Sequence, residues 1–266
     1  MRSLSTTISV SKCYREERTI MAYIHNPKTR GSGILCCIPQ IGKCPNDCPN
    51  CFYQSGASYL EPLSENLPNM PFAEVQEHQV VRVNDGNDSN NDWNTVVHGS
   101  SWFYHRFFNT SVPKLDFPAP VVLTLNPADK TDKDFHVLQY VPANLMFLRW
   151  RANLWNIAQL KDAITFYTGQ QHAELRRRVP IVVTWMCYSD ENSIPESYRH
   201  GYEWRTHVSN PYWQVRPSEW DAVMLLFRDN PYVYSCGTPW SSLCSRCGNC
   251  LREWHATMER MEKRDD

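Results

Sequence analysis

The chain has 266 residues, of which 42% are hydrophobic and 21% charged, as expected for a globular protein with one large core. Its formal net charge of −1 offers no long-range attraction for nucleic acid or for an acidic membrane surface. No segment approaches the roughly 20 apolar residues of a membrane helix, and residues 1–24 lack the apolar stretch of a signal peptide. We therefore expect a soluble, cytoplasmic protein with neither a membrane nor a nucleic acid as its partner.

Six short apolar runs recur along the chain and lack the alternation of a one-sided sheet, which predicts strands buried on both faces. Helical spacing occurs in residues 156–175 and 218–228. Alternating strands and helices imply a parallel sheet, either doubly wound or curled into a full or partial barrel, with function at the carboxyl ends of the strands. The predicted strands are residues 33–38, 79–83, 120–125, 145–150, 180–187 and 232–236.

Cysteine is the most informative residue type. The chain has eleven, and in the reducing cytosol such a number indicates metal or redox chemistry rather than disulfides. Three of them, Cys44, Cys48 and Cys51, directly follow the first predicted strand in the run CPNDCPNCFY. Three thiolates leave one iron of a four-iron cluster open for a small molecule, whereas a closed zinc site needs a fourth ligand.

This CxxxCxxC run, followed by aromatic residues in a loop after the first strand, resembles the signature of the radical S-adenosylmethionine (radical SAM) enzymes. The resemblance implies that Cys44, Cys48 and Cys51 bind a [4Fe-4S] cluster whose open iron chelates SAM. It also implies that Phe52 or Tyr53 lies near the adenine of SAM. The alternative is a zinc knuckle completed by a distant histidine or cysteine.

Polar loops after later strands are candidates for further SAM contacts. Members of the family usually have a Gly-Gly-Glu-like segment after the second strand, and this chain instead has NDGNDS at residues 84–89. Asp85 and Asp88 are the candidate acceptors for the SAM ammonium group, although the run also suits a plain turn.

The fourth predicted strand carries Arg149, with Arg151 just beyond it on the same face by strand alternation. By resemblance either could contact the carboxylate or ribose of SAM, and Asn153 could contact the ribose. The alternative for each arginine is a structural ion pair with a carboxylate in the core. No GxIxGxxE-like pattern marks the fifth strand.

A second group of four cysteines begins at the end of the last predicted strand and precedes a charged tail. Its members are Cys236, Cys244, Cys247 and Cys250. Two CxxC steps suit one tetrahedral metal or one cubane, so this site is interpreted as an auxiliary iron–sulfur cluster or a structural zinc site. The other cysteines are expected to be buried hydrophobes, with Cys187 at a strand end as the exception to test.

Together these features predict an α/β fold, a (β/α)6 partial TIM-type barrel over residues 1–235 with a cysteine-rich C-terminal extension over residues 236–266. The predicted function is reductive cleavage of SAM to a 5′-deoxyadenosyl radical that acts on an unidentified small-molecule or peptide substrate. An electron donor such as ferredoxin or flavodoxin would be required, and no residue that acts on the substrate is identified. The alternatives are a zinc-stabilised binding protein and a two-cluster iron–sulfur electron-transfer protein.

Overall fold

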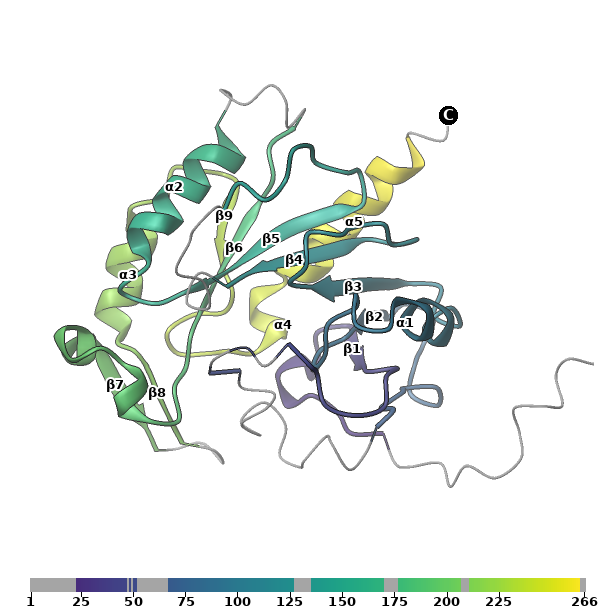
Figure 1. The fold of residues 1–266 in the computed structure, drawn as a ribbon, viewed down its shortest axis with the longest axis horizontal. Helices are drawn as coiled ribbons and strands as arrows, with labels where there is room; N and C mark the ends of the chain where they lie inside the picture. The colour runs from purple at the N-terminus through teal and green to yellow at the C-terminus, as the bar shows by residue number, and fades with distance from the viewer. Residues whose placement is uncertain are drawn as a thin grey trace, which may run out of the picture.

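The computed structural model describes residues 23–46, 48, 50–51, 67–126, 135–169, 177–206 and 211–263. These residues form a mixed α/β fold whose centre is a seven-stranded sheet (Figure 1). All neighbouring strands in this sheet are parallel, and the sheet is curled into a half-barrel. The strands, in spatial order, are β1 (Ile34–Cys37), β2 (Val80–Val83), β3 (Arg106–Thr110), β4 (Val121–Leu125), β5 (Leu145–Ala152), β6 (Ile181–Trp185) and β9 (Val233–Ser235).

The strands are buried on both faces, which agrees with the absence of apolar/polar alternation in the sequence. β1 and β2 are buried at every position, and β5 at all positions but one. Both faces are therefore covered, as parallel sheets require. All six predicted strands are present in this sheet.

The six-strand count was nevertheless wrong, because β3 was missed. Its sequence, RFFNT, has only two apolar residues and lies in a long connection rich in polar residues. Phe107 and Phe108 are fully buried, one on each face of the sheet, and this burial sustains the strand.

Helices cover the outer face of the half-barrel. α1 (Trp93–Gly99), α2 (Ile157–Thr168) and α3 (Pro217–Leu225) contribute buried side chains to the larger core cluster. The helical periodicity predicted over 156–175 and 218–228 corresponds to α2 and α3, although residues 170–176 lie outside the described part of the chain. The remaining short turns are η2 (Pro27–Thr29), η6 (Glu191–Ser193) and η7 (Glu196–Gly201).

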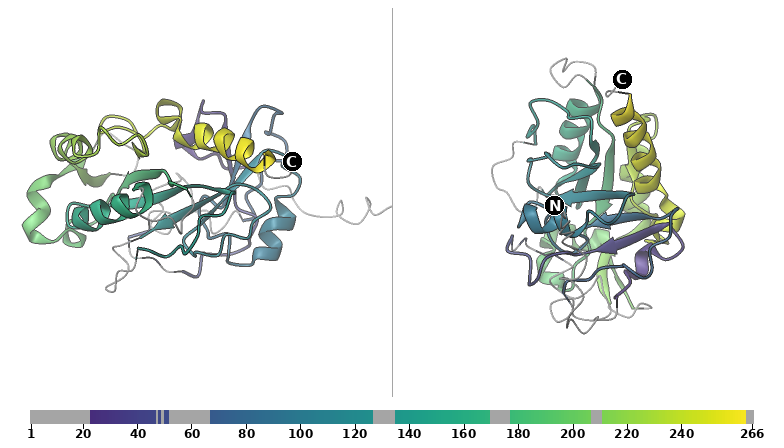
Figure 2. Two further views of the ribbon diagram at one scale, coloured as in Figure 1. Left: turned by 90° about the horizontal axis from the view of Figure 1, so that it is seen from above. Right: turned by 90° about the vertical axis from the view of Figure 1, so that its right-hand side faces the viewer.

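The inner face is covered by α5 (Asn249–Glu262), which crosses the sheet on the side opposite α2 (Figure 2). Trp254 of α5 is buried against Phe147 and the other residues of the smaller core cluster. Its indole N–H donates to the carbonyl oxygen of Arg106 at 3.1 Å, and Arg260 donates to that of Leu145 at 3.1 Å. The C-terminal segment thus shares its core with the sheet.

Two further elements lie beside the carboxyl edge of the sheet. β7 (Tyr202–Arg205) and β8 (Tyr212–Val215) form an antiparallel hairpin that was not predicted. α4 (Cys244–Cys247) connects β9 to α5 and lies against η2 near the start of the described chain. None of the described helices combines the length and apolar character that crossing a bilayer requires.

Candidate functional site

Parallel strands place all their carboxyl ends at one edge, and this edge surrounds a cavity of about 640 Å³. Connections from both ends of the described chain reach it, and eight of the ten described cysteines line it. The two cysteine groups predicted from the sequence therefore share one cavity. The lining cysteines are Cys44, Cys48, Cys51, Cys187, Cys236, Cys244, Cys247 and Cys250.

The first cysteine group lies on the connection after β1. Cys51 N donates to the carbonyl oxygen of Cys48 at 3.1 Å, which folds the loop back on itself. Asn91, on the connection after β2, donates to the sulfur of Cys44 at 3.5 Å and to the side-chain oxygen of Asn46 at 3.1 Å. Burial raises the pKa of the Cys44 thiol. Phe52 and Tyr53, the predicted adenine contacts, lie outside the described residues.

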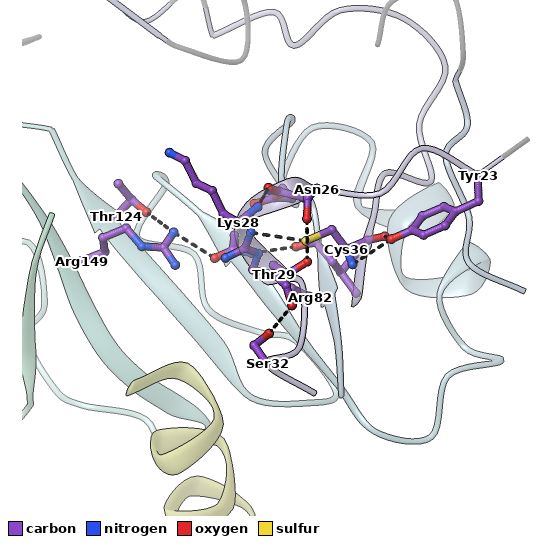
Figure 3. Close-up of polar contacts among 12 residues, drawn as sticks. Tyr23, Asn26, Lys28, Thr29, Ser32, Cys36, Arg82, Thr124 and Arg149 are labelled. Carbon is purple, nitrogen blue, oxygen red and sulfur yellow. Dashed lines mark hydrogen bonds and ion pairs between the residues drawn. The ribbon is translucent and has the colours of Figure 1, made fainter. Parts of the chain in front are cut away.

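Asp85 lines the cavity and contacts a polar cluster that joins the segment around Asn26 to the sheet. Figure 3 shows the members Asn26, Arg82, Cys36 and Tyr23 of this cluster. The carboxylate of Asp85 forms an ion pair with Arg82 at 2.5 Å and accepts a hydrogen bond from Asn26. Arg82 also donates to the sulfur of Cys36 at 3.3 Å, and the hydroxyl of Tyr23 donates to the carbonyl oxygen of Cys36 at 2.7 Å. Asp85 thus holds Arg82 and the N-terminal turn in place.

Asp88 also lines the cavity, but its carboxylate is surrounded by donors of the protein. Thr110 Oγ1 donates to it at 2.7 Å, Ser111 N at 2.6 Å, Ser111 Oγ at 2.8 Å and Asn90 N at 2.9 Å. A carboxylate offers about four acceptor positions. The main role of Asp88 in this arrangement is to anchor the connection after β3 to the connection after β2.

Arg149 extends from β5 on the inner face of the sheet. Its guanidinium donates to Asn109 Oδ1 at 3.1 Å and to Thr124 Oγ1 at 3.5 Å, and lies 5.8 Å from the centre of the Phe147 ring. It forms no ion pair with any carboxylate in the described part of the chain. The structural ion pair considered for this residue is therefore not found, and its positive charge remains available at the cavity.

The other two candidates after β5 differ from each other. Arg151 lines the cavity beside Thr184, its partner in the register of β5 and β6. Asn153 is fully buried and does not line the cavity. Neither polar atom of the Asn153 side chain has a hydrogen-bond partner among the described residues. Its contact with a ribose therefore stays a prediction.

The second cysteine group is built on regular elements. Cys236 follows β9 and continues its pairing with β6 by donating its N–H to Val183 O at 2.8 Å. Cys244 and Cys247 are the first and last residues of α4, and Cys250 lies in the first turn of α5. All four thiols therefore take their positions from the sheet and from the helix that packs on it.

Electrostatics at this second group differ from thiol to thiol: the pKa is lowered at Cys236 and raised at Cys244, Cys247 and Cys250. A hydrogen bond from the Cys247 thiol lowers the pKa of Cys236 and raises that of Cys247, and the positive charge of Arg149 lowers the pKa of Cys236 further. Burial raises the pKa of Cys250 to about 11, against the effect of Arg149 and Arg82. Two arginines thus face thiols whose anionic forms they stabilise.

The thiols are not arranged as a finished metal site. Within the described residues, no three histidine, cysteine, aspartate or glutamate side chains have the arrangement that holds a metal ion. The donor chemistry still suits a cluster, because two groups of thiols and two arginines line one cavity and iron–sulfur clusters take cysteine ligands.

Sequence reasoning missed the contributions of the N-terminal turn and the β7–β8 hairpin. Lys28 of η2 and Arg205 with Tyr212 of the hairpin all line the cavity. The turn carries no motif that could have revealed it. The alternation of aromatic and polar residues in YEWR could have predicted β7. The expectation that Cys36 and Cys37 are buried is confirmed, and Cys13 lies outside the described residues.

Comparisons of the chain with protein-family models, curated proteins and solved structures found no match. The function of the site must therefore be argued from its own chemistry.

Proposed function

We propose that the protein is a radical SAM enzyme, whose cluster is bound by Cys44, Cys48 and Cys51. The observation that carries this proposal is that these three thiols line one cavity with Arg149 at the carboxyl edge of a parallel half-barrel. We further propose that the sheet is the open TIM-type barrel of that family and that residues 236–266 form its cysteine-rich extension. A [4Fe-4S] cluster bound there would supply the electron that cleaves SAM reductively to methionine and a 5′-deoxyadenosyl radical.

The residues of the chain would hold SAM by complementary charge. Arg149 is not neutralised by a described carboxylate and lines the cavity, so it is the candidate partner for the SAM carboxylate. Arg151 is a second candidate on the same face. Asp85 lies on the opposite part of the sheet, after β2, and is the candidate acceptor for the ammonium group. Asp88, whose carboxylate already accepts four hydrogen bonds from the protein, would hold the surrounding loop in place.

We propose that the four C-terminal cysteines bind a second [4Fe-4S] cluster rather than zinc. Their thiols line the same cavity as the first group instead of forming a separate structural site. Electrons would come from a donor such as ferredoxin or flavodoxin, and the substrate would be a small molecule or a peptide.

Electron paramagnetic resonance of the anaerobically reconstituted, dithionite-reduced protein tests this function. A cluster signal that shifts when SAM is added, and that Cys44→Ala removes, is the expected result. Cys37→Ala is the matched control, since Cys37 is buried in β1 and does not line the cavity. Iron signals indifferent to SAM would instead favour an electron-transfer protein, and zinc as the only metal would favour a zinc-stabilised binding protein.

A further inference from the structure

We propose that the mouth of the cavity binds an aromatic anion, a flat ring that carries a phosphate or carboxylate group. The residues that would bind it are Arg205, Tyr212, Trp240 and Arg246, which we call the rim residues. The inference rests on the proposed function, because it takes this anion to be the substrate on which the enzyme acts.

Trp240 is held at the tip of a tight turn between the cysteines of the second group. Thr238 and Ser241 pair through N–H···O bonds of 2.9 and 3.1 Å. Gly237 has a φ of +81°, and a Cβ atom there would lie 2.8 Å from Ser241 O. Trp240 is 72% exposed even though it lines the cavity. A large ring exposed on a hydrogen-bonded turn is well suited to stack against another flat ring.

Arg205 places a positive charge beside this turn. Its guanidinium donates to Pro239 O at 3.1 Å, one residue before Trp240. Arg205 lies directly opposite Tyr212 in the β7–β8 hairpin, and Tyr212 is half-buried. The hairpin and the turn therefore bring two aromatic rings and a cation to one side of the cavity.

The charge of the whole cavity points to an anion. Among the described residues, six basic side chains line it and two acidic ones, Asp85 and Asp88, which leaves an excess of four positive charges in a chain of net charge −1. SAM does not account for this excess, because its sulfonium and ammonium groups outnumber its single carboxylate. The two proposed clusters with their seven thiolates carry negative charge and offset only part of it. A concentrated positive potential inside a low-dielectric cavity attracts anions. The six basic residues are Lys28, Arg82, Arg149, Arg151, Arg205 and Arg246.

The basic residues divide between the interior and the mouth. In the interior, Arg82 forms an ion pair with Asp85, and Arg149 donates to Asn109 and Thr124. Arg246, by contrast, is exposed and forms no ion pair with a described residue. It is therefore available for an incoming ligand.

Isothermal titration calorimetry under anaerobic conditions tests the proposal on the reconstituted full-length protein. Saturating S-adenosylhomocysteine would fill the SAM site first, so that only other binding is measured. The probes are adenosine 5′-monophosphate and indole-3-acetate, which carry a ring with a phosphate and with a carboxylate. Adenosine and inorganic phosphate each provide one half of that chemistry. We expect at least one complete probe to bind about tenfold more tightly than either half, and the better probe identifies the anion.

Variants at the mouth then locate the binding. Trp240→Ala and Arg205→Ala should each weaken binding of the better probe by about tenfold, as expected when a stacking platform or a charged partner is lost. Arg246→Ala removes a second positive charge from the cavity mouth at an exposed position outside the β7–β8 hairpin, so it tests the role of charge without altering the hairpin. The matched controls are Trp102→Ala and Arg228→Ala, because both residues are exposed and neither lines the cavity. The controls should change the affinity less than twofold.

Equal affinity for complete and half probes, or equal effects of the rim and control variants, would overturn the proposal. Its failure can be told apart from failure of the proposed function. If the cluster signal responds to SAM but the protein binds neither complete probe, the proposed anion site is refuted and the proposed function is not. Rim-dependent binding in a protein whose iron ignores SAM would refute the radical chemistry and keep the binding site.

Discussion

The two cysteine groups lie in one cavity, but the chain builds them differently. The first depends on a loop after the edge strand β1, held to the rest of the protein by polar contacts such as Asn91 with Cys44 and Asn46. The second stands on β9, α4 and α5, and Trp254 fixes α5 to the inner face of the sheet. The apolar core therefore positions one group and polar loop contacts position the other.

This difference indicates how each group would respond to metal. Sites that are not preformed take their order from the ion, so metal binding and local folding are coupled. We expect the first group to gain most of its order from the cluster, and the second to keep its place without one. The predictions below test this contrast, from the largest effect on stability to the smallest.

Trp254→Ala should cause the largest loss. The side chain is 5% exposed in the core between α5 and the sheet, and truncating such a residue costs about 3–5 kcal/mol. Urea denaturation of the metal-free protein measures this loss. Trp102→Ala, at an 81% exposed position, should stay within about 0.5 kcal/mol of the wild type. An unchanged urea midpoint for Trp254→Ala would mean that α5 does not carry the second group.

Asp88→Asn should cost about 2–3 kcal/mol, because an amide cannot accept all the bonds that Thr110, Ser111 and Asn90 donate to the carboxylate. The change loosens the connection that bears Asn91 and, through it, the first cysteine group. Thermal unfolding measures the effect, with the exposed Asp116→Asn as the control. Equal melting temperatures for the two variants would contradict this anchoring role.

Gly237→Ala should destabilise the protein by more than the ~1–2 kcal/mol that a left-handed backbone costs an alanine, because the added Cβ would also lie 2.8 Å from Ser241 O. Gly31→Ala is the matched control, because Gly31 also has a positive φ but no atom within 4 Å of an added Cβ. The difference between the two variants in denaturant unfolding isolates the close approach to Ser241 O. A Gly31 variant that loses as much stability as the Gly237 variant would show that the turn is not tightly built.

Cys44→Ala should have the smallest effect on the metal-free protein, within about 0.5 kcal/mol, because a half-buried loop thiol contributes little packing. After reconstitution the same variant should lose the iron of the first group and keep that of the second. Iron analysis together with urea denaturation checks both statements. Simultaneous loss of all iron would mean that the two groups form one site.

Much of this contrast could be predicted from the sequence. The six short apolar runs predict strands directly, and parallel order then brings the polar residues after them to one edge. β3 escaped because its burial depends on Phe107 and Phe108 packing on opposite faces, which a five-residue run with three polar residues does not reveal. Lys28 and Arg205 were not predicted as cavity residues, because tertiary packing alone brings each of them to the cavity.

The charge partners could not be predicted either. An arginine in a strand needs acceptors, but the sequence cannot say whether these are carboxylates or neutral groups. Arg82 is paired with Asp85, whereas Arg149 rests on Asn109 and Thr124. The register of β3, β4 and β5 places the neutral side chains of Asn109 and Thr124 beside Arg149. Its positive charge is therefore not offset by a described carboxylate, and the proposed SAM contact depends on that charge.

The formation of 5′-deoxyadenosine from SAM tests the central claim most directly. The reconstituted protein is incubated anaerobically with SAM and dithionite, and the products are separated by liquid chromatography. We expect the wild type and Cys37→Ala to produce 5′-deoxyadenosine and methionine, and Cys44→Ala to produce neither. Iron-loaded wild-type protein that yields no 5′-deoxyadenosine, or a Cys44→Ala variant that yields as much as the wild type, would contradict it.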